Sequence, residues 1–419
     1  FTAPRTPVEQ AIARVWAKTL GITDIGIHDN FFELGGDSIL SIQIVSRVRK
    51  IGLHITPGMM FRYQTVAELA AHAGNTTNIH AAQGPVNGTA PLTPIQNWFF
   101  ERDLTEAHHF NQSVHLELET VDPDLLDQAL TALLKHHDIL RSNYTHTNGR
   151  WTQTITDHTP ETILHRHDLS QIPPEEQPAH QEHIAEQTQR SLNLTEGPLI
   201  QAALLDLGPR NHRLLIAIHH LLVDGVSWRI LLEDLGNAYH QLTNGEEITL
   251  PLKTSSYLDW ANHLEQHAQT EKLHTEIPYW TSQTTTNHPH PHTTPTTLNT
   301  TTLTLTPHDT TALLRDVPRA FGTQINDVLL TALAIAHHRT TGNPDLHVDL
   351  EGHGREELFD DIDLLRTVGW FTTIFPVHIT ATTNPTETLK NTQKALENIP
   401  NKGIGYGILR YLATPRTRQ

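Results

Sequence analysis

The pattern of apolar and polar residues divides the chain into a short helical part and a longer part that mixes strands and helices. In the first 74 residues, apolar side chains recur every three or four positions, as in amphipathic helices. The stretch TPVE predicts a capping box, with Thr6 as N-cap, Pro7 as first helical residue and Glu9 bonding back to the cap. Three more helical segments are expected: one from near Ser38, one around PGMMFRYQT, and TVAELAAHA, which Gly74 ends.

From Pro91 onward the pattern indicates an α/β fold. SVHLELE (113–119) alternates like a strand, and PDLLDQALTALLKHH (123–137) has the spacing of an amphipathic helix. The apolar run RLLIAIHH (213–220) predicts a second strand, and SWRILLEDLGNAYHQL (227–242) a second helix. After residue 300, TLTLTP, the helical DVLLTALAIAHHR and the strand LHVDLEG begin a second α/β lobe.

Two segments of biased composition separate these parts. NTTNIHAAQGPVNGTA is polar and predicts a linker. TSQTTTNHPHPHTTPTTLNT is rich in Thr, Pro and His, and we favour a crossing between lobes over a metal-binding tract because it shows no fixed ligand spacing. The expected organisation is a helical domain, a linker, a first lobe, a crossing and a second lobe, at 1–74, 75–90, 91–280, 281–300 and 301–419.

Composition narrows the possible functions. The chain has 29 Lys and Arg against 46 Asp and Glu, a net charge of −17, which argues against binding nucleic acid or an anionic membrane. It has no Cys, so a disulfide, a thiolate nucleophile and a Cys-ligated zinc are excluded, and a cytoplasmic location is expected. No apolar run approaches the ~20 residues of a membrane span. Because the first residue is Phe1, we expect a piece of a longer protein.

The stretch GGDSILSIQ places Ser38 at the start of a helix. Taken alone, such a serine is an ordinary N-cap. However, DNFFELGGDSILSIQIVSRVRK resembles the core motif of peptidyl carrier domains, whose serine carries a 4′-phosphopantetheine arm. The resemblance implies Ser38 as the attachment residue, and a helix N-terminus favours the resulting phosphodiester. Carriers of this family that precede epimerisation domains often read GGDS, so Asp37 also hints at the neighbouring domain.

The stretch HHLLVDG (219–225) resembles the HHxxxDG motif of the condensation-domain superfamily, whose fold is two chloramphenicol-acetyltransferase-like lobes around a tunnel. The resemblance implies that His220 points into the tunnel and that Asp224, in the turn with Gly225, pairs with an arginine. The expected partner is Arg141, in HHDILR. Other interpretations are a packed His219–His220 pair, a solvated acid at the turn, or a metal site. Adjacent strand residues point to opposite faces, which disfavours the metal.

Five further blocks decide between condensation and epimerisation. Each resembles an epimerisation-domain block, and condensation domains do not normally carry EGHGRE. The resemblance therefore implies a carrier–epimerisation didomain of a nonribosomal peptide synthetase. The family continues to a later FNYLG-type block that is absent before Gln419, so we expect an incomplete second lobe that is less stable than a full didomain. The blocks are PIQNWFF, DGVSWRILLEDL, EGHGRE, TVGWFTTIFPV and NKGIGYGILRYL.

Inverting Cα requires a base on one face and an acid on the other. We expect His220 and Glu351 in these roles, with a one-base variant, in which Glu351 protonates and His220 stabilises the enolate oxygen, left open. Glu351 could instead lie in a turn and pair with Arg355. His353 is open to either role, and Tyr406 could line the tunnel, donate to the enolate oxygen or pack at a turn. Trp228 and Trp370 are expected as wall or core residues.

The resemblance also implies partners and rivals. The expected partners are an upstream adenylation domain, which chooses the amino acid, a phosphopantetheinyl transferase that loads the arm, and a downstream condensation domain. One rival is a condensation-type acyltransferase that forms peptide bonds. The other is a carrier joined to a docking lobe without catalysis. Neither rival predicts exchange of the Cα proton.

Overall fold

The computed structural model describes residues 1–75, 81–160, 162–284 and 300–414. Residues 76–80 of the predicted linker, and most of the predicted crossing with its His-rich tract, 285–299, lie outside the described residues. The chain forms two compact units. One comprises Phe1–Thr77, Glu271–Glu356 and Ile374–Tyr406; the other comprises Asn78–Thr270, Glu357–Thr373 and Gly407–Gln419.

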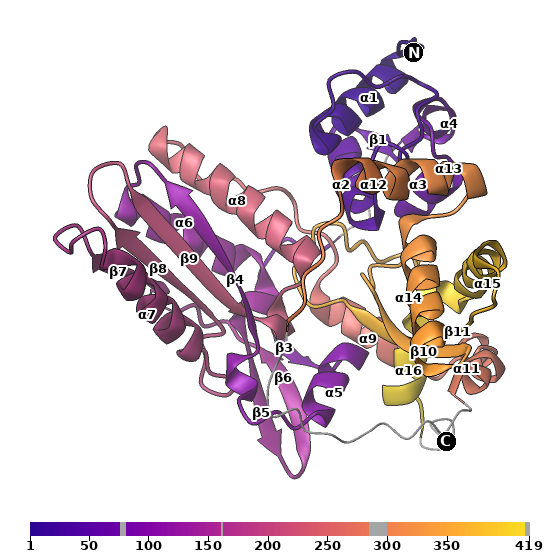
Figure 1. The fold of residues 1–419 in the computed structure, drawn as a ribbon. Helices are drawn as coiled ribbons and strands as arrows, with labels where there is room; N and C mark the ends of the chain where they lie inside the picture. The colour runs from indigo at the N-terminus through magenta and orange to yellow at the C-terminus, as the bar shows by residue number, and fades with distance from the viewer. Residues whose placement is uncertain (76–80, 161, 285–299, 415–419) are drawn as a thin grey trace. The chain divides into compact units, whose positions relative to one another are not determined.

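The N-terminal helical part contains the four expected helices (Figure 1). Thr6 caps the first of them, and the capping box with Glu9 is formed. Gly74 does not cap the last helix, because it pairs in a two-residue antiparallel ladder, β1 (Leu53–His54) with β2 (Gly74–Asn75). The helices are α1 (Pro7–Leu20), α2 (Ser38–Lys50), α3 (Pro57–Arg62) and α4 (Val66–His72). Their core is built from Ile12, Trp16, Phe31, Ile44, Val45, Val48, Met60, Val66 and Leu69.

The first lobe is built on a four-stranded sheet in the order β4-β9-β8-β7. Only its β7–β8 pair is parallel. Strands β8 and β9 are buried along almost their whole length, because helices cover both faces. Helix α7 covers one face, and α6 and α8 pack side by side against the other (Figure 1). The elements are β4 (Asn111–Leu118), α6 (Pro123–His136), β7 (Leu164–Asp168), α7 (Gln177–Arg190), β8 (Ile200–Asp206), β9 (His212–His219) and α8 (Gly225–Thr243).

A second sheet of the same unit has the order β3-β6-β5. It was not predicted from the sequence. Gln96 is fully buried and donates to Tyr144 Oη and Gln153 Oε1, at 3.0 Å each, and so ties α5 to β5 and β6. The elements are β3 (Gly88–Ala90), α5 (Pro94–Glu101), η1 (Ala107–His109), η2 (Asp138–Arg141), β5 (Ser142–Thr147), β6 (Arg150–Ile155), η3 (His220–Leu222) and α9 (Tyr257–His267).

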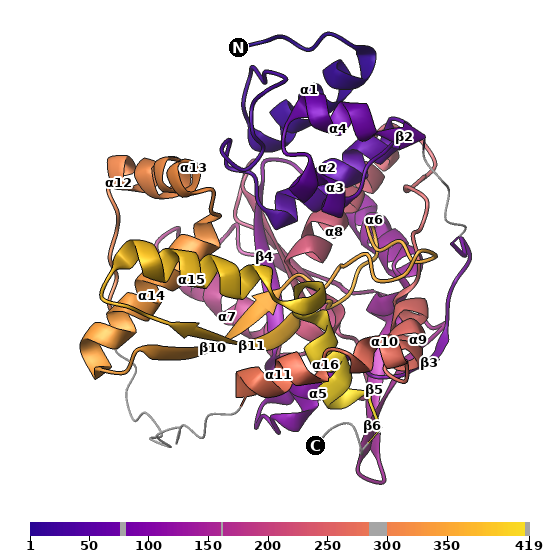
Figure 2. The same cartoon turned by 90° about the vertical axis from the view of Figure 1, so that its right-hand side faces the viewer.

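The second lobe, in the other unit, contains a two-stranded sheet, β10 with β11. Figure 2 shows α14 and α15 beside it. The predicted helix DVLLTALAIAHHR and strand LHVDLEG are present as α14 and β10, whereas residues 300–306 lack regular structure. The elements are α10 (Glu271–His274), α11 (Ile277–Thr284), α12 (Pro307–Thr311), η4 (Ala312–Asp316), α13 (Val317–Phe321), α14 (Ile325–Thr341), β10 (Asp345–Gly352), β11 (Thr373–Thr380), α15 (Pro385–Glu397), η5 (Pro400–Gly403) and α16 (Ile404–Tyr411).

No helix among the described residues is both long enough and apolar enough to cross a bilayer. The order of the helices and the composition of the sheets agree with the predicted class, a small helical domain followed by a two-lobed α/β domain.

Candidate functional site

Ser38 is the first residue of α2, and Asp37 rather than Ser38 is the N-cap. The Asp37 carboxylate accepts from the backbone N–H of Leu40 at 2.7 Å. The Ser38 hydroxyl is therefore not needed for capping. Gly36 lets the backbone pass the buried ring of Phe31, since a Cβ at Gly36 would lie 2.4 Å from that ring. The half-buried Ser38 hydroxyl at a helix N-terminus fits a phosphodiester, because the backbone N–H groups and the dipole favour negative charge there.

His219 is the last residue of β9 and is fully buried. Its Nε2–H donates to the Ala107 carbonyl at 2.8 Å, and its Nδ1 accepts from the Leu221 N–H at 3.2 Å. Both ring nitrogens are thus committed to the backbone. Burial lowers the pKa of His219 to about 4, outweighing the bond to Ala107. His219 is therefore a neutral, structural side chain.

His220 lies one residue beyond the strand, in η3, and its backbone N–H continues the ladder by donating to the Phe110 carbonyl at 2.9 Å. Two aromatic rings pack against it and also against each other, with the Phe110 and Trp370 centroids 5.9 Å apart. Phe110 is stacked on it with centroids 5.4 Å apart, and Trp370 packs at 4.3 Å. The remaining ring edge approaches Gln112, whose Nε2 is 2.9 Å from His220 Nε2. Phe110, Trp370 and Gln112 together hold the orientation of the imidazole.

Asp224 caps α8, whose first residue is Gly225 rather than a residue near Ser227 as the sequence predicted. Its Oδ1 accepts from Ser227 N–H at 2.7 Å and its Oδ2 from Phe371 N–H at 3.2 Å. The Ser227 hydroxyl donates to the Gly369 carbonyl at 2.9 Å. The start of α8 is thus bonded to the backbone of residues 369–371, which carry Trp370. Two sequence blocks about 145 residues apart meet at one site.

The predicted pairing of Asp224 with Arg141 is wrong. Arg141 Nη2 donates to Asp138 Oδ1 at 2.8 Å, and its other nitrogens donate to main-chain carbonyls, including Leu134 at 2.7 Å. The physical reason is local. Arg141 and Asp138 lie three positions apart in η2, so their side chains meet within one turn. Arg141 therefore stabilises the end of α6 and the start of β5.

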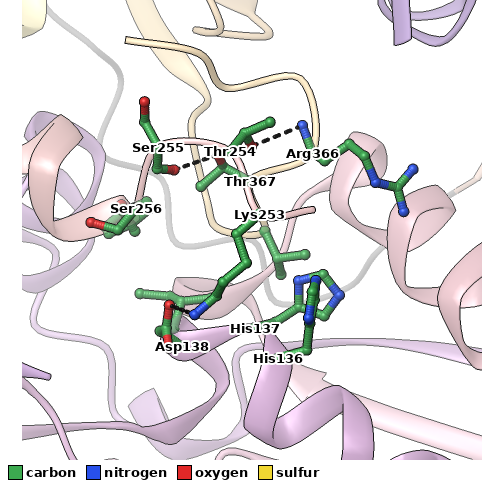
Figure 3. Close-up of a pocket in the computed structure, with 12 residues that line it drawn as sticks. His136, His137, Asp138, Lys253, Thr254, Ser255, Ser256, Arg366 and Thr367 are labelled. Atoms are coloured by element: carbon green, nitrogen blue, oxygen red, sulfur yellow. Dashed lines mark hydrogen bonds and ion pairs between the residues drawn. The ribbon is translucent and has the colours of Figure 1, made fainter. Parts of the chain in front are cut away.

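A pocket that is open to solvent lies beside Asp138 (Figure 3). It has an empty volume of about 330 Å³, and mostly polar residues from three segments line it. Lys253 Nζ lies 2.6 Å from Asp138 Oδ2. Arg366 is ion-paired with the buried Asp234, whose second oxygen lies 3.0 Å from His137 Nε2. The lining residues are His136, His137, Asp138, Ile139, Lys253, Thr254, Ser255, Ser256, Tyr257, Arg366, Thr367 and Val368.

Two residues of this pocket, His136 and His137, and the buried Asp234 behind them have the donor atoms of a metal site. Burial, followed by the neighbouring His137, lowers the pKa of His136 to about 4, so its imidazole is neutral. However, both Asp234 oxygens already have partners, and a cation there would face the Arg366 guanidinium. We therefore assign the cluster a structural role. The ion pair between Asp234 and Arg366 anchors residues 366–368, which lie just before Gly369 and Trp370.

Glu351 lies near the end of β10, in the other unit, and its side chain is exposed. None of the hydrogen bonds and ion pairs that we find in the described parts of the chain engages its carboxylate. A pairing of Glu351 with Arg355 is not among the ion pairs of the described residues, and the backbone N–H of Arg355 donates to His353 Nδ1 at 3.0 Å. His353 Nε2 lies 3.4 Å from Glu356 Oε1.

Tyr406 is half-buried near the start of α16, with its ring centroid 5.4 Å from that of Trp280. The Glu276 carboxylate supports this block. It is buried and accepts from Trp280 Nε1 at 2.9 Å and Asn401 Nδ2 at 2.6 Å. Gly405 leaves room for it, since a Cβ there would lie 2.0 Å from Glu276 Oε2. This support was not predicted from the sequence.

A helical carrier-like domain with an uncommitted serine, joined to an α/β domain with paired histidines after a central strand, defines a carrier-linked enzyme domain. Residues 86–419 match the family described as Condensation domain, and residues 10–73 match the family described as Phosphopantetheine attachment site. The chain therefore belongs to the condensation-domain family of nonribosomal peptide synthetases, preceded by a carrier domain whose cofactor is covalently attached 4′-phosphopantetheine. Such domains work in general with adenylation domains, phosphopantetheinyl transferases and condensation domains.

Curated relatives agree with this family. Linear gramicidin synthase subunits B and C of Brevibacillus parabrevis are 48% and 46% identical over 99% and 98% of this chain. The chain spans 8% and 5% of their lengths. Among solved structures, the epimerization domain from the third module of tyrocidine synthetase B matches with a TM-score of 0.71 and 38% identity, covering 81% of this chain and 77% of that chain.

A condensation domain shares the fold at lower sequence identity. The first condensation domain of the calcium-dependent antibiotic synthetase matches with a TM-score of 0.61 and 20% identity, covering 79% of this chain and 78% of that chain. At that level the likeness concerns the fold alone.

Sequence reasoning missed the immediate surroundings of His220. Phe110 lies directly before β4, and Gln112 lies near its start. The sequence predicted this strand, but only the pairing of β4 with β9 brings the two side chains beside His220. Trp370 was expected as a wall or core residue, and it is buried against His220. Gln112 lies opposite Ile218, two residues before His220. This position could have indicated Gln112, but it can be recognised only when the register of β4 with β9 is known.

Proposed function

We propose that the chain carries an aminoacyl or peptidyl thioester on Ser38 and inverts the configuration of its Cα from L to D. The observation that carries this proposal is the 38% identity to a solved epimerization domain over most of the chain, against 20% for a condensation domain of the same fold. The EGHGRE block, with Glu351 exposed near the end of β10, adds support.

The reaction moves one proton off Cα and one proton back to its opposite face. The phosphopantetheine arm presents the substrate as a thioester, whose carbonyl acidifies the Cα proton. His220 suits the base or acid role because an imidazole can both accept and donate a proton, and Phe110, Trp370 and Gln112 hold its ring in place. Glu351 is the second group, since its carboxylate is not engaged by the described residues. One-base and two-base schemes use the same pair of residues.

The supporting residues have defined tasks in this proposal. His219 is neutral and holds the end of β9, while Asp224 and Gly225 start α8 and hold the segment with Trp370. Tyr406 is the candidate donor to the substrate carbonyl. The proposed partners are an upstream adenylation domain that supplies the L-aminoacyl group and a downstream condensation domain that accepts the D-configured donor.

The test loads the whole chain with an L-aminoacyl-pantetheine arm in deuterated water, using a phosphopantetheinyl transferase. Release of the amino acid, chiral chromatography and mass spectrometry then report configuration and deuterium. We expect D-isomer with one deuteron, lost in His220→Ala and strongly reduced in Glu351→Gln. Asp349→Asn is a matched control, because Asp349 is an exposed carboxylate on the same face of β10, two residues earlier.

Two results would overturn the proposal. Loading at Ser38 without Cα exchange, with amide formed when an aminoacyl acceptor carrier is added, would identify a condensation-type acyltransferase. Loading with neither reaction would identify a carrier joined to a non-catalytic lobe. Loading that persists in Ser38→Ala would contradict the assignment of the attachment residue.

A further inference from the structure

We infer that Gln112, held by Trp228, is a positioning residue that fixes which ring nitrogen of His220 carries the proton. Trp228 Nε1 donates to Gln112 Oε1 at 2.9 Å, and Gln112 Nε2 lies 2.9 Å from His220 Nε2. The three side chains come from α8, β4 and η3 and form one continuous chain of hydrogen bonds. The catalytic consequence rests on the proposed function, whereas the protonation pattern itself does not.

The direction of this hydrogen-bond chain follows from its first member. An indole nitrogen is a donor and never an acceptor, so the group that faces Trp228 must be the amide oxygen of Gln112. The opposite orientation would set the amide NH₂ against the indole N–H, two donors facing each other at a buried site. The Gln112 NH₂ group consequently faces His220. The indole donor therefore determines the orientation of the Gln112 amide.

His220 Nε2 must then accept, because an amide NH₂ group only donates. A neutral imidazole with Nε2 as acceptor carries its proton on Nδ1. The ring has little freedom to turn away from this arrangement, since Phe110 and Trp370 pack against it and its own backbone N–H is bonded to the Phe110 carbonyl. Gln112 and Trp228 therefore favour the Nδ1–H tautomer of His220, against the cost of burying that N–H.

The arrangement also has a consequence for proton transfer. When Nε2 takes up a proton, its N–H points at the Gln112 NH₂ group, and one of the two must turn away. Protonation at Nε2 is thereby disfavoured relative to a site with an acceptor in place of Gln112. In the proposed epimerisation, Nε2 takes up the Cα proton only when the Gln112 NH₂ group moves aside, and return of the proton is favoured because Gln112 does not stabilise the imidazolium.

Nitrogen NMR of the imidazole rings tests the inference on the whole chain without any reaction. The His220 signals are assigned by their loss in His220→Gln. We expect an unprotonated Nε2 in the wild type. Trp228→Phe removes the indole donor, so the amide can turn and offer its oxygen to Nε2–H. We then expect the tautomer population to move toward Nε2–H and the His220 titration midpoint to rise by about one pH unit.

Trp370→Phe is the matched control, since it changes the aromatic wall of His220 by the same substitution but leaves the Gln112 amide held. It should keep Nε2 as acceptor. Gln112→Glu supplies a carboxylate acceptor and should raise the midpoint more than Trp228→Phe does. His219 is next to His220 in the chain and His108 lies near His219, and these two histidines and Asp224 are common to all of these variants.

An Nε2–H tautomer in the wild type would overturn the inference, as would a Trp228→Phe variant with an unchanged tautomer and midpoint. If Cα exchange is observed, the acid limb of its pH profile should shift upward in Trp228→Phe and Gln112→Glu. If the NMR result holds and no exchange occurs, the positioning role stands and the proposed function fails. If exchange occurs and the tautomer does not respond, the positioning role alone fails.

Discussion

Buried His219 makes the first lobe sensitive to acid. Its ring is fully buried between β9 and η1, and both nitrogens serve backbone groups. Burial lowers its pKa from 6.5 to about 4. The folded state therefore holds the neutral form, while the unfolded chain takes up a proton below pH 6.5. The free energy of unfolding contributed by this residue is complete above about pH 6.5 and is lost as the pH falls toward 4.

The size of the effect follows from the two pKa values. At pH 5 the unfolded state binds most of one proton and the folded state little of one, which lowers the free energy of unfolding by about 2 kcal/mol relative to pH 8. Below pH 4 the loss levels off at about 3 kcal/mol. Such a loss is large, since domains are stable by only about 5–15 kcal/mol.

Hydrogen exchange detected by mass spectrometry can measure this loss locally, on peptides from β4 and β9, with rates corrected for intrinsic exchange at each pH. The comparison is between wild type and His219→Gln, whose amide can still donate to the Ala107 carbonyl but does not titrate. We expect the fall in opening free energy between pH 8 and pH 5 to be smaller in the variant by about 2 kcal/mol. Other histidines contribute to both proteins and cancel in the difference.

His115→Gln removes an exposed histidine from β4 and controls for the loss of an imidazole from the same pair of strands. It should retain the wild-type fall. If His219→Gln also retained the wild-type fall within about 0.5 kcal/mol, the reasoning from burial to a lowered pKa would be refuted.

Two further predictions concern backbone positions that the structure explains. Gly405→Ala places a Cβ 2.0 Å from Glu276 Oε2 and should lower the free energy of unfolding, measured by urea denaturation, by about 1–3 kcal/mol. Gly236→Ala is the control, because a Cβ there meets open space on α8, and it should be neutral or stabilising. Equal effects of the two substitutions would contradict the packing argument. Asp224→Ala removes a helix cap and the acceptor of Phe371 N–H, and should cost about 1–3 kcal/mol with faster exchange of that amide; unchanged exchange would argue against the bond.

The fold class could be predicted because its signals are local. The capping box at Thr6, the helical spacing up to Gly74 and the apolar strand before His219 each depend on residues close together in the sequence. The strand ending at residue 219 and the helix after Asp224 were found in this way, with the helix start displaced by two residues. Such displacements are common at helix ends.

The surroundings of the site could not be predicted, since they depend on tertiary pairing. Arg141 was matched to a distant acid, yet the nearer Asp138, three residues away, is its partner. Trp370 packs on His220 from a position 150 residues further along the chain, and no local pattern encodes that contact. Gln112 reaches His220 through the β4–β9 register, which period-2 alternation alone does not fix.

The contacts around Trp370 give the HHLLVDG motif a structural role besides the chemistry of His220. The carbonyl of Trp370 accepts from Tyr257 Oη at 3.0 Å, and the flanking backbone is held by Ser227 and Asp224. Four hydrogen bonds thus hold the backbone at and on both sides of Trp370 before any substrate arrives. Because Trp370 packs on the His220 ring, the acid of the motif helps to orient that ring through the backbone of residues 369–371. Loss of Asp224 should therefore impair the orientation of His220 even though the histidine itself is unchanged.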